Sequence, residues 1–145
     1  MRADFTERYG PVAVVTGASS GIGYAFAEEL ADRGLDLVVT ARRLDRLEEL
    51  ATRLTRQHGV KVMSRQADLA DPVAPRQLVE FTAGMDVGLV ISNAGFGLRR
   101  GPHEAHDAAT LTALLMLNCH ATSALAHGFV PRLRARGKGG IIGGA

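Results

Sequence analysis

The sequence contains little sulfur and few aromatic rings. Its 145 residues include one cysteine, no tryptophan, two tyrosines and five phenylalanines. The single cysteine, Cys119, cannot form an internal disulfide, which excludes a disulfide-stapled scaffold and agrees with the cytoplasmic location that we predict. Because Cys119 lies in an apolar stretch, we expect it in the core rather than at a reactive site. With so few rings, the core must consist mainly of aliphatic and alanine side chains.

Strong charge of one sign and long apolar runs are also missing. The formal net charge is +2, and the 17 basic residues, only two of them lysine, are spread along the chain, which argues against a nucleic-acid partner. The N-terminal stretch MRADFTERYG lacks the apolar run of a signal peptide. No segment approaches the roughly 18 apolar residues of a membrane span, so we expect no membrane partner. We treat residues 1–145 as one domain.

Short apolar runs alternate with amphipathic segments. Strands are predicted at 11–16, 36–40, 60–66, 86–92 and 141–142, and helices at 21–33, 44–57, 71–83 and 107–136. This alternation is typical of a parallel sheet covered by helices on both faces. Right-handed crossovers then favour an α/β, Rossmann-like doubly wound sheet with strand order 3-2-1-4-5. We predict Asp71 as the N-cap of the third helix, and we expect Pro131 to bend or fray the end of the fourth.

A glycine-rich stretch follows the first predicted strand. Glycine allows the backbone to turn tightly and approach a pyrophosphate, and the free N–H groups of the next helix then face the anion. The strand before it and the helix after it provide the context that such a loop requires. The alternative is a tight turn without a ligand. We predict a phosphate-binding loop comprising Gly17, Ser19, Ser20, Gly21, Ile22 and Gly23.

The end of the second strand bears on the choice between NAD and NADP. An NAD site places a carboxylate there for the ribose 2′-OH, but the residue is Thr40. Asp36 begins the strand, and four residues at about 3.3 Å each separate it from the carboxyl end. Arg42 and Arg43 follow the strand, where a guanidinium can grip a 2′-phosphate. The alternative is that both belong to a solvated helix face. We predict NADP rather than NAD.

Taken together, the motifs resemble the classical short-chain dehydrogenase/reductase family. The stretch from Thr16 to Gly23 is similar to the family's T-G-x-x-x-G-x-G fingerprint, and the resemblance extends from about residue 10 to 145. Ser92 replaces the first asparagine of the family's N-N-A-G motif. Further positions match in order: Asp68 with Leu69 near the adenine ring, Asn93, Ala94 and Gly95 after the fourth strand, and Asn118 of the catalytic tetrad.

The resemblance implies hydride transfer between the nicotinamide and a small-molecule carbonyl or secondary alcohol. Arg42 would be the main contact of the 2′-phosphate, with Arg43 auxiliary. Asn118 would hold a water in a proton relay. It also lies at helical spacing from Leu111, Leu114 and Leu115, so a structural role, bonded to a neighbouring carbonyl, is the alternative.

Some of the family's catalytic residues have no counterpart here. The resemblance calls for a Tyr-x-x-x-Lys pair, but neither Tyr9 nor Tyr24 is followed by such a lysine. The family's serine would follow the fifth strand, near residue 145. We therefore expect an N-terminal fragment of a sheet of about seven strands, inactive and marginally stable alone, from a homo-oligomeric parent. The alternatives are a non-catalytic NADP-binding module or partner subunit, and a remnant without function. His103 and His106 lack further ligands, so no metal is expected.

Overall fold

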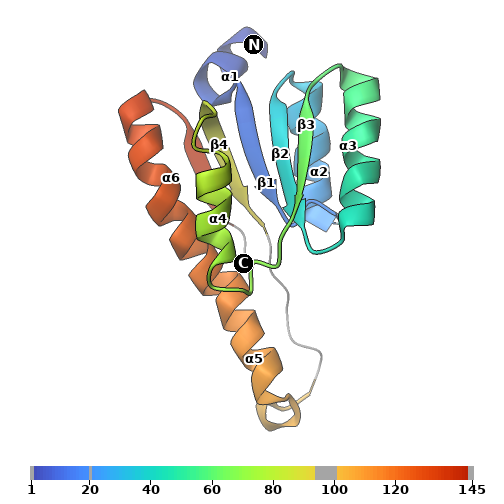
Figure 1. The fold of residues 1–145 in the computed structure, drawn as a ribbon, viewed down its shortest axis with the longest axis vertical. Coiled ribbons are helices and arrows are strands. Elements are labelled where there is room, and N and C mark those ends of the chain that lie inside the picture. Colours follow the sequence, from blue (N-terminus) through green and yellow to red (C-terminus); the bar gives the residue numbers. More distant parts are fainter. Residues whose placement is uncertain (1, 20, 94–100, 144–145) are drawn as a thin grey trace.

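The computed structural model describes residues 2–19, 21–93 and 101–143 (Figure 1). The strands are β1 (Val12–Thr16), β2 (Asp36–Ala41), β3 (Val62–Gln66), β4 (Val87–Ser92) and β5 (Gly140–Gly143). The α-helices are α1 (Arg2–Tyr9), α2 (Gly21–Asp32), α3 (Leu44–His58), α4 (Ala74–Phe81), α5 (Ala108–Leu115) and α6 (Thr122–Arg136). Between α5 and α6 lies a π-helical segment, η2 (Met116–Ala121), and a 3-10 turn, η1 (His103–Ala105), precedes α5.

The described strands form one parallel sheet in the order β3-β2-β1-β4-β5, which confirms the predicted topology. The registers place Thr16 beside Thr40, and Ser92 beside Gly143. Because all these strands run in one direction, their carboxyl ends meet at a single edge of the sheet. In an open α/β sheet this edge is where ligands bind.

Alternate residues of β1 belong to two cores, one on each face of the sheet. Val15 packs with residues of α2 and α3, whereas Val14 packs with Leu78 of α4 and Phe129 of α6. The four side chains are completely buried. A strand covered on both faces must be apolar at every position, which explains the continuous run VAVV.

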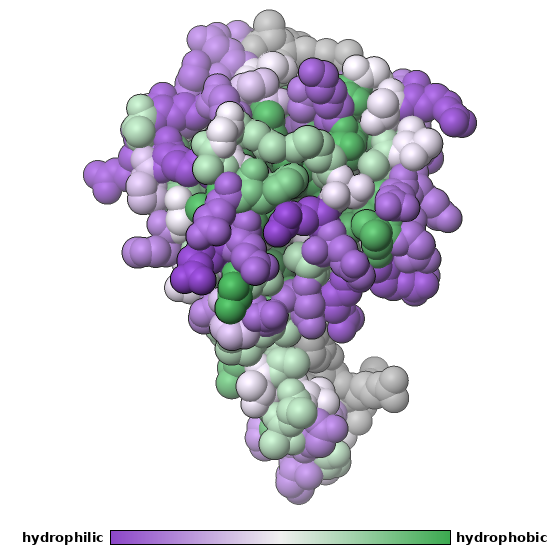
Figure 2. All heavy atoms as spheres, in the orientation of Figure 1, coloured by the Kyte–Doolittle hydropathy of each residue, from purple (hydrophilic) through white to green (hydrophobic). Residues whose placement is uncertain are grey.

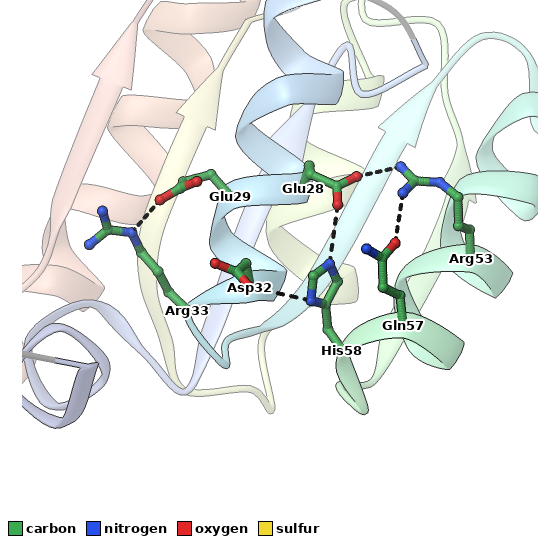
Figure 3. Close-up of polar contacts among 7 residues, drawn as sticks. All are labelled: Glu28, Glu29, Asp32, Arg33, Arg53, Gln57 and His58. Carbon is green, nitrogen blue, oxygen red and sulfur yellow. Dashed lines mark hydrogen bonds and ion pairs between the residues drawn. The ribbon is translucent and has the colours of Figure 1, made fainter.

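A polar cluster joins α2 to α3 beside the core that contains Val15 (Figure 3). Glu28 accepts a hydrogen bond from Arg53 through one carboxylate oxygen, and its other oxygen lies 3.2 Å from Nε2 of His58. Nδ1 of His58 lies 3.7 Å from a carboxylate oxygen of Asp32. The hydrogen bond from Arg53 holds the pKa of Glu28 below its ordinary value. The cluster therefore links the C-terminal halves of α2 and α3, the two helices that pack on this face of the sheet.

Helix α1 was not predicted, because its amphipathic pattern is weak. Its Phe5 and Tyr9 rings lie 5.0 Å apart and pack against the core shared with α2 and α3. Arg136, at the end of α6, donates hydrogen bonds to the carbonyls of Arg8 and Gly10, and to Asp86 at 2.8 Å. Helix α1 is thus held by contacts with residues distant in the sequence.

Three predictions about helix ends need correction or refinement. Asp71 does not cap α4: its carboxylate accepts from the N–H of Val73 at 3.0 Å in a preceding turn, and the helix begins at Ala74. Asp107 does cap α5, accepting from the N–H of Thr110. Pro131 lies inside α6, and the last turn after it is helical to Arg136, so it is not frayed; the helix stops at Gly137 in the left-handed conformation.

The long C-terminal helical region also differs from the predicted regular helix. Its π segment was not predicted, Cys119 is exposed rather than in the core, and Leu115 is 59% exposed. Helix α5 projects beyond the sheet, so its side chains cannot all reach a core (Figure 1). The regularly spaced leucines therefore do not form one continuous buried stripe.

The same region corrects the expectation that no segment is apolar enough to cross a membrane. Helical residues Ala108–Arg136 pass a test of length and composition for a span, with a mean hydropathy of 1.3 in their most apolar 18-residue window, although core helices of soluble proteins pass it too. Only 17% of the most apolar window is buried within the chain. Figure 2 shows pale green and hydrophilic residues mixed on its projecting end.

Candidate functional site

The glycine-rich loop joins β1 to α2 at the carboxyl edge of the sheet. Gly17 and Gly21 have φ angles of 64° and 61°, a conformation that side chains rarely adopt. A Cβ atom on Gly23 would lie 2.1 Å from the carbonyl oxygen of Gly17 and 2.8 Å from Nδ2 of Asn93. The loop therefore needs glycine at these positions, and it folds directly against Asn93. Ser19 is half-buried beside it.

The remaining predicted nucleotide-binding residues near the loop are Ser20, Ile22, Ala94 and Gly95. Ile22 is 67% exposed, so its backbone rather than its side chain is the candidate ligand-binding group. Ser20, Ala94 and Gly95 lie outside the described residues.

Thr16, which was not predicted as a site residue, links the loop to β4. Its buried hydroxyl donates to the carbonyl of Ile91 at 3.3 Å and accepts from the N–H of Asn93 at 2.9 Å. Both groups lie at the end of β4, so one side chain joins the two strand ends that carry the predicted phosphate-binding residues. Its position immediately before Gly17 is the sequence feature that would have indicated this role.

The turn after β2 is fixed by neighbouring strands. The N–H of Ala18 donates to the carbonyl of Thr40 at 3.2 Å, which ties the glycine-rich loop to this turn. The N–H of Ala67 donates to the carbonyl of Ala41 at 3.0 Å. Nε2 of Gln66 donates to the carbonyl of Arg42 at 2.9 Å, a contact that no sequence pattern indicated. The backbone from which the Arg42 side chain extends is therefore held in place.

The two arginines themselves are exposed. Nη2 of Arg43 lies 3.7 Å from a carboxylate oxygen of Asp45, and both side chains are more than half exposed, so the pair contributes little. Arg42 forms no ion pair with the residues that the structure describes. Asp36 accepts a hydrogen bond from the N–H of Lys61 at 2.9 Å, at the opposite edge of the sheet. No carboxylate of β2 is therefore near the turn that carries the arginines.

Asp68 and Leu69 follow β3 at the same edge. One carboxylate oxygen of Asp68 accepts the N–H of Ala70 at 3.0 Å, which orients the exposed side chain. Leu69 is 3% exposed and packs in a small core with Ala74, Leu117 and Ala121. This small core connects the predicted adenine side of the site to the π segment.

Asn118 lies within that π segment and is half-buried. Its neighbour Leu117 is buried in the core with Leu69. Directly after the segment, Oγ1 of Thr122 lies 2.9 Å from Oγ of Ser92, the residue that replaces the family's first asparagine. The structure thus places the Asn118 segment against the ends of β3 and β4.

No metal centre is evident within the part of the chain that the structure describes. Among residues 2–19, 21–93 and 101–143, no group of three or more His, Cys, Asp or Glu side chains could hold a metal ion. His103 is exposed, whereas His106 is half-buried next to the capping residue Asp107. The arrangement therefore consists of glycine backbone, hydroxyls, an amide, a carboxylate and two guanidiniums, which is chemistry suited to a phosphorylated nucleotide.

Comparison with known proteins agrees with this geometry. A family model described as short chain dehydrogenase matches residues 11–143. The chain is 33% identical over 139 residues to 7beta-hydroxysteroid dehydrogenase of Clostridium sardiniense, covering 96% of this chain and 53% of that protein.

The solved structures similar to this chain include two complexes with NADPH from different organisms. One is a short-chain dehydrogenase from Sphingobium yanoikuyae, with a TM-score of 0.83 and 40% identity over 91% of this chain and 52% of that one. The other is L-sorbose reductase from Gluconobacter frateurii, also complexed with L-sorbose, with a TM-score of 0.84 and 37% identity over 92% and 51%. The chain therefore spans about half the length of these relatives.

Proposed function

Because this chain belongs to the short-chain dehydrogenase/reductase family, we propose that it is the NADP-binding part of an oxidoreductase that transfers hydride between the nicotinamide and a carbonyl or secondary alcohol. One observation carries the choice of NADP. Two exposed arginines follow the carboxyl end of β2, and β2 itself contributes no carboxylate there; hydrogen bonds from Ala18, Gln66 and Ala67 fix the backbone.

Arg42 is the proposed main contact of the 2′-phosphate, and Arg43 supports it. A guanidinium forms charge-assisted, bidentate hydrogen bonds to a phosphate. An NAD-binding chain would instead need an acid at Thr40, to accept from the 2′-OH. The NADPH present in the two solved relatives supports the same choice.

The pyrophosphate and adenine would bind beside this turn. Gly17, Gly21 and Gly23 allow the backbone to approach the pyrophosphate, and the N-terminus of α2 favours its negative charge. The carboxylate of Asp68 retains an oxygen beyond the one that accepts from Ala70, and this oxygen can accept from the adenine amino group. When bound, NADPH would supply the hydride, and Asn118 would hold a water near the reacting carbonyl.

The proton for the developing alkoxide would have to come from elsewhere. Tyr9 packs against Phe5 in α1, and the hydroxyl of Tyr24 bonds to Arg53. Neither tyrosine is followed four residues later by lysine. We therefore propose that these 145 residues bind NADPH without turnover, and that a longer, homo-oligomeric cytoplasmic protein containing them performs the reaction.

A titration of the chain with NADPH and NADH, followed by nicotinamide fluorescence, tests this function. We expect NADPH to bind at least about tenfold more tightly, because one charged hydrogen bond contributes roughly 1.5–3 kcal/mol. Incubation of the complex with aldehydes and ketones is expected to leave its absorbance unchanged. Equal affinity for both nucleotides would contradict the assignment of NADP. Oxidation of NADPH by a carbonyl would contradict the proposal of binding without turnover.

A further inference from the structure

The position of Asn118 depends on an unusual stretch of helix. In a π helix the hydrogen bonds run from residue i to i+5, which widens the turn, and such segments are rare and short. If η2 reverted to a regular α-helix, Asn118 would rotate by about 100° per residue of lost register. Something outside the segment must therefore hold it in register.

One side of the segment is held by apolar packing. Leu117 and Ala121, which are 6% and 1% exposed, pack against Leu69 and Ala74. Aliphatic packing is not directional, and it tolerates a small rotation of the helix. It explains why the segment stays close to the end of β3, but it does not explain why its register is unique.

The other side is held by a directional contact. Thr122 is the first residue after the π segment, and its Oγ1 lies 2.9 Å from Oγ of Ser92. Ser92 is 2% exposed and is the last residue of β4. Its sheet neighbour Gly143 also approaches Thr122, since a Cβ atom built there would lie 3.4 Å from the threonine methyl. Thr122 is thus seated on the ends of β4 and β5.

We propose that Ser92 and Thr122 are positioning residues for Asn118, and that their hydroxyl–hydroxyl hydrogen bond fixes the register of the π segment against the end of β4. Asn93, which follows Ser92, is bound to Thr16 beside the glycine-rich loop. The helical region that carries Asn118 and the strand end before the nucleotide-binding loop are therefore both hydrogen-bonded to the end of β4. The catalytic meaning of this link rests on the proposed function, whereas the link itself does not require a bound nucleotide.

Four single variants test the pair. Thr122→Val and Ser92→Ala each remove one hydroxyl and leave the other without its partner, whereas Thr122→Ser keeps a hydroxyl. Thr112→Val makes the same threonine-to-valine change at an exposed site on α5. The measurements are the NMR signals of the Asn118 side-chain amide, assigned with Asn118→Asp, and backbone hydrogen exchange along the nucleotide-free chain.

We expect Thr122→Val and Ser92→Ala to shift the Asn118 amide signals and to speed exchange in residues 117–121 about tenfold, the loss typical of one such hydrogen bond. Exchange in α2 and α3 should not change. Thr122→Ser should restore the original signals, and Thr112→Val should have no effect. The double variant should be little worse than either single one, because both changes remove one interaction.

Unchanged Asn118 signals and exchange in both hydroxyl-removing variants would overturn the proposal. Equally faster exchange throughout the chain would overturn it as well, because the pair would then be a general stability contact. A separate NADPH titration of the parent chain distinguishes the two proposals. Failure to bind NADPH would remove the proposed function, and the exchange data would still decide whether the pair holds the segment.

Discussion

At the scale of single residues, the site depends on a few atoms with little freedom. The oxygen of Thr16 serves both Ile91 and Asn93, and Gly23 leaves no space for a methyl group beside Gly17. The backbone and short side chains meet these constraints, so they fix the loop conformation without long side chains. Arg42 is different, because its backbone is fixed and its guanidinium extends into solvent. Such an arrangement is suited to a charged ligand.

Arg42→Ala is expected to weaken NADPH binding about tenfold or more, the value of one charge-assisted hydrogen bond, and to leave NADH binding nearly unchanged. The reason is that NADH lacks the 2′-phosphate that the guanidinium would bind. Fluorescence titration of the parent and the variant with each nucleotide measures the change in the ratio of the two dissociation constants.

Arg46→Ala is the matched control, since Arg46 is an exposed arginine of neighbouring α3. It should reduce the affinity for neither nucleotide by more than a small factor. An equal loss of NADPH and NADH affinity in Arg42→Ala would show that Arg42 supports the fold of the turn rather than binding the 2′-phosphate.

At the scale of secondary-structure elements, α2 and α3 are joined by the polar cluster around Glu28 (Figure 3). The hydrogen bond from Arg53 is the largest cause of the lowered pKa of Glu28, and the hydrogen bond with His58 adds to it. Because the folded-state pKa lies below the ordinary value of 4.5, the cluster stabilises the fold above about pH 4.5. This contribution is lost as the pH falls through the lowered pKa.

Glu28→Gln is therefore expected to destabilise the chain at pH 7 by less than about 1 kcal/mol, because the ion pair is partly solvated. The difference from the parent should shrink as the pH falls below 4.5. Urea unfolding of the parent and the variant at several pH values measures this difference in the free energy of unfolding. Glu29→Gln, which removes the same charge from an exposed pair with Arg33, should have a smaller effect at pH 7. A Glu28→Gln difference that grew on acidification would contradict this account.

The elements also show what could be predicted from the sequence. The strands could be placed from apolar runs, because a doubly covered parallel strand must be apolar throughout, as in β1 and β4. Their order followed from the alternation of strands with helices and from right-handed crossovers. The glycine-rich loop, Asp68 and Asn93 could be placed because strand ends fix their positions. Helix α1 and the π segment could not be predicted, because contacts such as Arg136 with Gly10 and Ser92 with Thr122 join distant parts of the chain. The apolar stretch around Cys119 indicated a core position, but Cys119 lies on the exposed side of the helix.

At the scale of the whole molecule, the described strands form an open parallel sheet whose carboxyl edge carries the candidate site. The ends of β1, β2, β3 and β4 bring together the glycine-rich loop, the arginine turn, Asp68 and Asn93. β5 is the outermost strand of the described sheet on the side opposite β3, and its Ile142 is 45% exposed. Leu115 of the projecting α5 is also exposed. Apolar side chains of the C-terminal region are therefore left uncovered within the described residues.

The most direct test of the central claim is urea unfolding of the chain with NADPH or with NADH at equal concentration. A ligand that binds only the folded state stabilises it, by about 2.7 kcal/mol when its concentration is one hundred times Kd. The account predicts that NADPH raises the unfolding midpoint clearly and that NADH raises it much less. Equal shifts with the two nucleotides, or no shift with either, would contradict it.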